Sequence, residues 1–235
     1  MSYASNFRFL STEYPLLFKI GQSAEYYLHS DPAVALVKMR VLCERIVEHC
    51  FDEECLAFPT QDTLHTRLKK LEYKGVLTDK VKNLFHLVKH RGNIAAHDHQ
   101  GSVEEAQRML EASFQIASWF YQVYSEENKD ISALHFQLPP DLDARHALHE
   151  LEQDMAALEA KYKALLDSRT LGELPEKRAE ELRQRRRKAD RKVEMNEDQT
   201  RELIDLQLRE AGWEVDTPIL NYKLHKTMPE RGRKM

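Results

Sequence analysis

Glycine and long apolar runs are both scarce in this sequence. Only 7 of its 235 residues are glycine, whereas alanine, leucine, glutamate, lysine, arginine and glutamine are common. Because these residues lose little side-chain freedom in a helix, the composition predicts a mostly α-helical chain. No apolar run approaches the ~20 residues that a membrane-spanning helix requires, so we expect no such helix.

Cysteine is also rare. The three cysteines, Cys43, Cys50 and Cys55, form no CxxC pair, and no signal-peptide pattern opens the chain. We therefore expect free thiols in a reducing, cytoplasmic location rather than disulfides. Cys43 and Cys50 are seven residues apart on one face of a predicted helix. This spacing favours burial as small apolar side chains over metal binding, and no metal site is predicted.

A general excess of positive charge is absent, because the net charge is −4. Any affinity for nucleic acid therefore has to come from a local cluster. One cluster lies in "KRAEELRQRRRKADRK", and its candidate nucleic-acid-binding residues are Arg183, Arg185, Arg186, Arg187, Lys188, Arg191 and Lys192. The run favours either contact with the backbone of DNA or RNA, or a solvated coiled-coil face interleaved with carboxylates. No aromatic residue interleaves with the cations, so base stacking is not predicted.

Apolar spacing predicts about five helices in residues 1–125. The second of them begins at Asp31 and Pro32 and places one apolar stripe at helical spacing: Ala35, Met39, Leu42, Ile46 and Cys50. Thr78 is predicted to cap a later helix, and Ser102 and Glu105 form a capping box for the next one. Short connections between these helices predict a compact helical bundle.

Two further segments follow the predicted bundle. Residues 126–141 include the Pro-rich "ISALHFQLPPD", which predicts an extended linker that lies against the bundle or acts as a spacer. In residues 142–194, apolar positions then alternate three and four apart, on both sides of a break at Pro175. This heptad pattern predicts a coiled-coil helical hairpin whose second arm is basic, or one arm of an intermolecular coiled coil.

Residues 195–235 begin with another capped amphipathic helix, which is predicted to end at Gly212. The segment after it, "WEVDTPILNYKLHKTMPERGRKM", has the character of a strand without a sheet to join. We therefore interpret residues 195–235 as the truncated start of an α/β domain. The overall fold prediction is an all-α chain, with a helical bundle and a coiled-coil hairpin before that start.

The polar stretch "LVKHRGNIAAHDH" ends an otherwise amphipathic helix. Arg91 has the planar fork that suits a phosphate, and His97 has a side chain that suits proton transfer near neutral pH. Residues six apart on an unbroken helix are rotated by about 240°, so their convergence requires Gly92 to end or kink the helix. Alternatively, Arg91 pairs with a carboxylate such as Asp98 and His97 satisfies a helix end.

Several segments in order resemble the N-terminal region of the R subunit of type I restriction enzymes: "SNFRFL", "ALVKMRVLCE", "LVKHRGNIAAHDH", "ASWFYQVY", "LREAGWEV" and "RGRKM". This resemblance implies an accessory domain, linker helices and the start of a nuclease domain, in a system that defends against foreign DNA. The full subunit would use ATP and Mg, but the sequence contains no GxxxxGK[ST] and ends before the nuclease acidic residues. We therefore expect no cofactor, cleavage or ATPase activity in this chain, and modification and specificity subunits as partners.

The accessory domain also resembles the HEPN group of helical domains. The HEPN signature is an Arg, four to six residues and a His, which Arg91 and His97 satisfy, with Asn93 as the polar member displaced by Gly92. In catalytic HEPN members, two protomers combine their Arg–His pairs and cut RNA without metal. Arg91, Asn93 and His97 are therefore candidate catalytic residues of a dimeric ribonuclease, the alternative to an interaction module. A structural spacer that sets oligomeric state is a third reading.

Overall fold

The computed structural model describes residues 3–127, 129–131, 133–141, 145–170, 172–213 and 215. The chain divides into two compact units, Met1–Glu194 and Met195–Met235. Every regular element within the described ranges is a helix, which confirms the all-α prediction. The predicted start of an α/β nuclease domain falls mostly after Val215 and lies outside the described residues.

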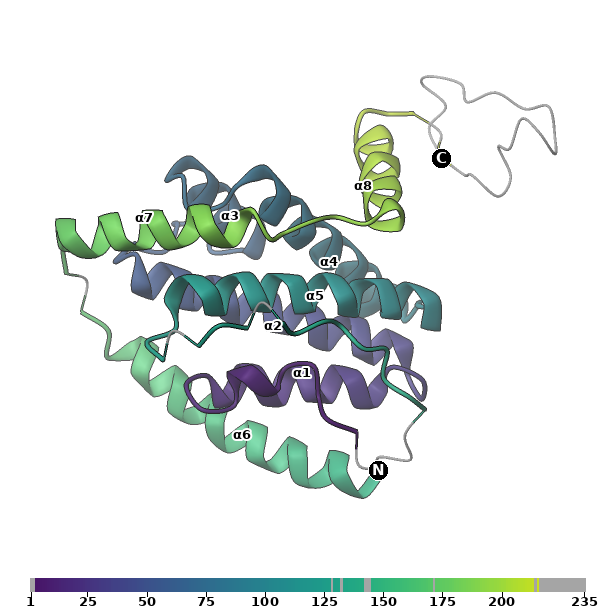
Figure 1. Ribbon diagram of the computed structural model, residues 1–235. Coiled ribbons are helices and arrows are strands. Elements are labelled where there is room, and N and C mark those ends of the chain that lie inside the picture. The colour runs from purple at the N-terminus through teal and green to yellow at the C-terminus, as the bar shows by residue number, and fades with distance from the viewer. Residues whose placement is uncertain are drawn as a thin grey trace. The chain divides into compact units, whose positions relative to one another are not determined.

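The first unit contains seven helices and a short 3-10 turn within the described ranges (Figure 1). After the turn at Arg8–Leu10, the helices are α1 (Pro15–Tyr27), α2 (Pro32–Glu53), α3 (Leu64–Tyr73), α4 (Asp79–Asp98), α5 (Val103–Tyr124), α6 (Arg145–Asp167) and α7 (Glu176–Asp190). The second unit contains α8 (Glu197–Glu210). The five helices predicted in residues 1–125 are α1 to α5.

Helix starts follow the capping residues that the sequence supplies. The Asp31 side chain accepts a hydrogen bond from the Val34 amide, with Pro32 in the first turn. Ser102 and Glu105 form the predicted capping box at the start of α5. Thr78 is the N-cap residue of α4, as predicted, but its hydroxyl makes no capping bond. That hydroxyl instead donates to Asp190, 3.3 Å away at the end of α7.

Helix α2 lies at the centre of the first unit and packs against α1, α4 and α5. Its predicted apolar stripe is fully buried, including Met39, Ile46 and Cys50. Buried aromatic side chains from several elements fill the space around it: Phe7, Phe51, Phe85, Trp119, Phe120 and Tyr124. Each large apolar side chain removed from water stabilises the fold by roughly 1.5–3 kcal/mol, so this core holds the first five helices together.

The predicted hairpin between the two heptad segments is wrong. Helix α6 packs against α1, where Lys19 and Asp154 form an ion pair of 2.9 Å. Helix α7 packs against α5 instead, so the two heptad helices have different partners (Figure 1). A three-and-four alternation specifies one apolar face of a helix but not the surface that covers it. Here the bundle covers Leu151 and Met155 of α6 and Leu182 and Ala189 of α7, whereas Leu165 of α6 stays exposed.

The described part of residues 126–141 lies against the bundle, which was one of the two predicted arrangements for this linker. Asn6 and Gln137 exchange two hydrogen bonds of 2.8 Å between side chain and backbone. The His29 ring lies 3.0 Å from the Pro139 carbonyl oxygen. None of the described helices combines the length and apolar character that crossing a bilayer requires.

Candidate nucleic-acid interface

Helix α7 carries the basic cluster, and one face of the helix is built into the bundle. Leu182, Arg186 and Ala189 are buried, and Val193 continues the same face just after the helix ends. These positions are spaced three and four residues apart, so they form one stripe along the helix. The stripe faces α5 and determines which of the predicted cationic side chains reach the surface.

Arg186 is the cation on the buried stripe. Its Nη2 donates to both carboxylate oxygens of Glu54, at 3.0 and 3.2 Å, and its Nη1 donates to the Gly75 carbonyl at 3.1 Å. Tyr124 of α5 donates its hydroxyl to the same carboxylate at 2.8 Å. Burial raises the pKa of Tyr124, so the phenol stays protonated and remains a donor. Arg186 is therefore engaged within the bundle, and its contact with nucleic acid stays a prediction that these bonds disfavour.

Two further polar side chains of α7 are also engaged with α5. Arg185 donates to the Ser125 carbonyl at 2.8 Å, where α5 ends, and forms an ion pair of 2.6 Å with Glu181. A cation at this position satisfies carbonyl groups that a helix terminus leaves unpaired. Asp190 accepts a hydrogen bond of 2.9 Å from the Trp119 indole, and burial raises the pKa of its carboxyl group. Arg185 thus has a structural role that the sequence alone did not indicate.

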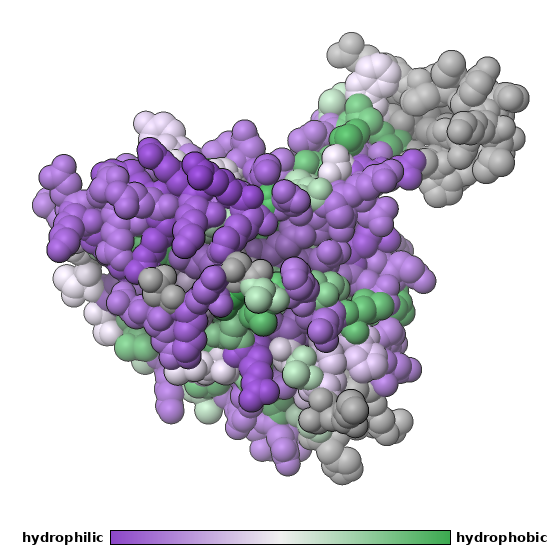
Figure 2. Space-filling model, in the orientation of Figure 1, coloured by the Kyte–Doolittle hydropathy of each residue, from purple (hydrophilic) through white to green (hydrophobic). Residues whose placement is uncertain are grey.

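The remaining predicted cations are all exposed, on α7 and just after its end: Arg183, Arg187, Lys188, Arg191 and Lys192. Arg183 pairs with Glu180 at 2.8 Å, and Lys192 approaches Asp130 at 3.8 Å. Within the described part of the chain, no carboxylate forms an ion pair with Arg187, Lys188 or Arg191. Figure 2 shows a mostly hydrophilic surface over α7. The structure therefore leaves five of the seven predicted cations exposed at the surface.

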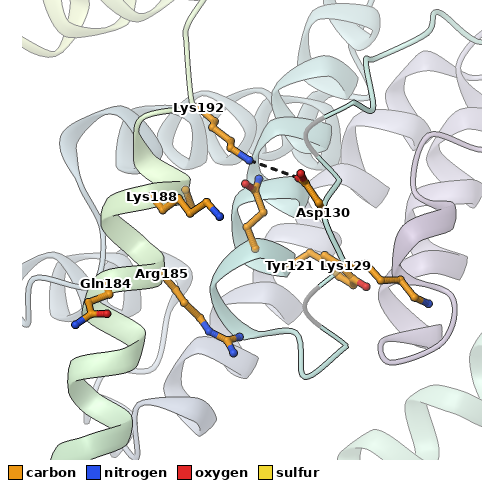
Figure 3. A pocket seen from close by; sticks show the side chains of 9 residues that line it. Tyr121, Lys129, Asp130, Gln184, Arg185, Lys188 and Lys192 are labelled. Carbon is orange, nitrogen blue, oxygen red and sulfur yellow. Dashed lines mark ion pairs between the residues drawn. The ribbon is translucent and has the colours of Figure 1, made fainter.

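A hollow of about 340 Å³ lies between α7, α5 and the extended segment. Lys188 of α7 and Lys192, just after the helix end, extend into it, and Asp130 faces Lys192 across it (Figure 3). Its other lining residues include Lys129 and Gln122, which sequence reasoning missed. No sequence signal places residues 60 positions from α7 beside the basic run, because only the docking of α7 on α5 brings them together. The hollow is a concave, predominantly cationic surface.

The second predicted site, on α4, is arranged differently from its prediction. Helix α4 continues without interruption from Asp79 to Asp98, so the predicted break at Gly92 is wrong. Gly92 is buried against α2, and a Cβ atom there would lie 2.5 Å from the Arg40 Cβ. Close packing of two helices, rather than backbone flexibility, accounts for this glycine.

Arg91 and His97 therefore remain on different sides of one helix, about 240° apart. The Arg91 guanidinium forms an ion pair of 2.9 Å with Glu105, the residue of the α5 capping box, so Arg91 pairs with a carboxylate as the alternative interpretation predicted. Asn93 is half-buried, and His97 is exposed in the last turn of α4. The fold of one chain does not bring the three candidate catalytic residues together.

The structure offers no metal centre among the residues that it describes, where no group of three histidine, cysteine or acidic side chains is suitably placed. Cys43 and Cys50 are fully buried, as predicted, and burial raises the pKa of both thiols. A protonated, buried thiol is a poor nucleophile and a poor metal ligand. These cysteines belong to the apolar core.

Comparisons with known proteins add a relationship to this geometry. Residues 22–135 match the family model described as a domain of unknown function, DUF4145. Over 94% of its length, the chain is 26% identical to the type I restriction enzyme EcoKI endonuclease subunit of Escherichia coli strain K12. The matched region is 23% of that protein, so the chain spans about a quarter of its relative. No solved structure matches the chain. The chain is therefore similar, at low identity, to part of a type I restriction endonuclease subunit, and its DUF4145 match spans α2 to α5.

Proposed function

We propose that this chain is an interaction module of a type I restriction endonuclease subunit, and that it binds the DNA backbone through the outer face of α7. The proposal rests on one observation: the cations of the basic cluster are divided between the buried core and the exposed surface. Arg186 is buried in an ion pair with Glu54, whereas Arg187, Lys188 and Arg191 are exposed and form no ion pair with any residue that the structure describes. The buried pair holds the helix, and the exposed side chains are available to anionic ligands.

The spacing of these cations suits a repeating anion. Arg187 lies in the last turn of α7 and Arg191 is its C-cap residue, four positions on, so the two lie about 6 Å apart along the helix axis. DNA carries regularly spaced phosphates, and each phosphate that a cation neutralises releases counterions. Since the net charge of the chain is −4, the attraction has to be local to this face.

In this proposal, DNA cleavage and ATP hydrolysis belong to the remainder of the related subunit. The chain contributes binding, and its other surfaces contact the modification and specificity subunits of a restriction complex. The homology to an endonuclease subunit supports this role, as does the resemblance of the ordered sequence segments. A DNA-contacting accessory unit also explains why its cations are concentrated on one helix.

The test is duplex binding by the full chain, measured by fluorescence anisotropy at low salt. A variant with Arg187→Gln, Lys188→Gln and Arg191→Gln should bind labelled duplex about tenfold more weakly, because three phosphate contacts are lost. The matched control carries Lys69→Gln, Lys74→Gln and Lys161→Gln, which removes the same charge from exposed positions on α3, α6 and the turn after α3. Equal losses in both variants would contradict the proposal. If, in addition, only the first variant failed to bind a partner subunit, the exposed cations of α7 would be assigned to contact with that subunit.

A further inference from the structure

A second hollow adjoins the cationic one on the surface of α5. It has a volume of about 360 Å³, and Gln122 and Lys192 line both hollows. Its wall is partly apolar, with Phe114, Trp119 and Ile131 among its lining residues. The ring of His135, from the extended segment, is the exposed aromatic group at its margin. The second hollow is also lined by the carboxylate Glu194. We call the two adjoining hollows the groove, with a cationic end and a partly apolar end.

Two polar atoms at the apolar end have no hydrogen-bond partner. The Gln115 Oε1 and Ser118 Oγ atoms are buried in the wall of the second hollow, and nothing in the described structure pairs with either. Buried polar atoms are almost always paired, so an unpaired one calls for a specific explanation. A ligand group that donates to the carboxamide oxygen and bonds the hydroxyl would satisfy both atoms after a small movement of their side chains.

We infer that this groove binds one unpaired nucleotide, with its phosphate at Lys188 and Lys192 and its base in the second hollow. The inference rests on the proposed contact between α7 and nucleic acid and names the form of the ligand. A nucleotide combines an anionic group with a planar base whose edge carries hydrogen-bond donors and acceptors. The first hollow offers cations, and the second offers an aromatic margin and two unsatisfied polar atoms. The aromatic residues that the basic run lacks are thus supplied by α5 and the extended segment.

The cations at the phosphate end of the groove differ in how firmly neighbouring residues hold them. Lys188 forms no ion pair with any described residue and extends into the hollow (Figure 3). Lys192 lies 3.8 Å from Asp130, a distance that leaves the pair easily exchanged for a phosphate. Arg185 is held by Ser125 and Glu181 and contributes charge without having to move. The phosphate therefore binds mainly to the two lysines.

The base end predicts a preference for single strands. In a duplex, each base is stacked and paired, so it reaches such a hollow only after extrusion, which costs a few kcal/mol. An unpaired strand avoids this cost and adds stacking on an exposed ring. A free mononucleotide has the same chemistry, and the experiment separates these two sources.

The experiment compares a labelled thymidine dodecamer, a duplex of the same length and a thymidine mononucleotide, each bound to the full chain. Mononucleotide binding is followed by Trp119 fluorescence in a Trp213→Phe background. The test variant combines Gln115→Met with Ser118→Ala, which removes the two unpaired polar groups while keeping their approximate shape. Since neither group is paired in the fold, thermal unfolding should be unchanged or shifted upward. Gln153→Met, at an exposed position of α6, is the matched control.

We expect the dodecamer to bind roughly fivefold or more tightly than the duplex, and the test variant to lose that preference. Duplex affinity should stay the same in both variants.

Equal binding of strand and duplex, unaffected by the test variant, would overturn the nucleotide site and leave the proposed duplex contact intact. If no nucleic acid binds, both proposals fail. A mononucleotide that binds as tightly as the dodecamer, and that loses affinity equally in the test variant, would identify a free nucleotide as the ligand. Equal displacement by an acidic peptide would show an unspecific cationic surface and overturn the inference.

Discussion

Arg186 and Arg187 are neighbours in the sequence and lie in opposite environments. The first is buried and hydrogen-bonded to Glu54, whereas the second is exposed on the outer face of α7. The apolar positions of the helix, Leu182 and Ala189, determine which neighbour faces inward. The same residue type therefore serves stability on one side of the helix and is available for binding on the other. Matched substitutions at buried and exposed positions test this contrast.

The largest expected effect is on the buried pair. Replacing Arg186 with Met leaves the Glu54 carboxylate buried without its cation, which should lower the free energy of unfolding by about 3–5 kcal/mol. Arg187→Met makes the same chemical change on the outer face and should shift it by less than about 0.5 kcal/mol. Urea unfolding followed by circular dichroism measures both. Equal losses would show that α7 is not held by this pair.

The next largest expected effect is on the pH dependence of stability, and it comes from one histidine. Burial lowers the pKa of His49 to about 4, and the aromatic rings of Tyr14, Phe120 and Tyr162 surround it. Because the unfolded histidine has its ordinary pKa near 6.5, the unfolded chain binds the extra proton between these values. This residue should therefore lower the free energy of unfolding by about 3 kcal/mol as the pH falls from 6.5 to 4. The free energy of unfolding of the wild type minus that of His49→Leu should fall by this amount across that pH range. A difference that stays constant with pH would refute the prediction.

A smaller effect on stability is expected from alanine substitutions at two glycines, one closely packed and one not. Gly92→Ala places a Cβ atom 2.5 Å from the Arg40 Cβ, so α2 and α4 have to separate. We expect a loss of about 1–3 kcal/mol from this overpacking. Gly172→Ala meets no atom within 4 Å and should leave stability unchanged or slightly raised. Thermal unfolding of the two variants makes the comparison, and a neutral Gly92→Ala would indicate that the helices are not closely packed.

The smallest expected effect is at His97. This side chain is exposed in the last turn of α4, and Arg91 is paired with Glu105 on another side of the helix. His97→Ala should change the free energy of unfolding by less than about 0.5 kcal/mol. Incubation of the chain with single-stranded RNA should give the same products for wild type and variant. Cleavage that the substitution abolishes would instead support the ribonuclease reading.

Local sequence signals predicted much of the fold. The five helices of residues 1–125, the Asp31 cap and the Ser102–Glu105 capping box all depend on neighbours within one or two turns. The partners of α6 and α7 were not predictable in the same way, because an apolar stripe does not name the surface that buries it. Gly92 was misjudged for a related reason: its role is a contact with Arg40, more than 50 residues away.

The candidate site was predictable only as a set of cations. Which of them reach the surface depends on Glu54, Tyr124 and Gly75, which α7 meets only in the folded bundle. The cationic hollow likewise combines α7 with Gln122 and Lys129. Long-range contacts of this kind leave no periodic trace in the sequence, so a single sequence identifies the charge but not its division between core and surface.

The most direct test of the central claim is the salt dependence of duplex binding. The logarithm of the binding constant should fall linearly with the logarithm of salt concentration, with a slope set by the phosphates that the outer cations neutralise. Replacing Arg187, Lys188 and Arg191 with Gln should make that slope shallower by about 3, close to one for each cation. A slope identical to that of the wild type would contradict the account, because it would place the DNA contact on another surface.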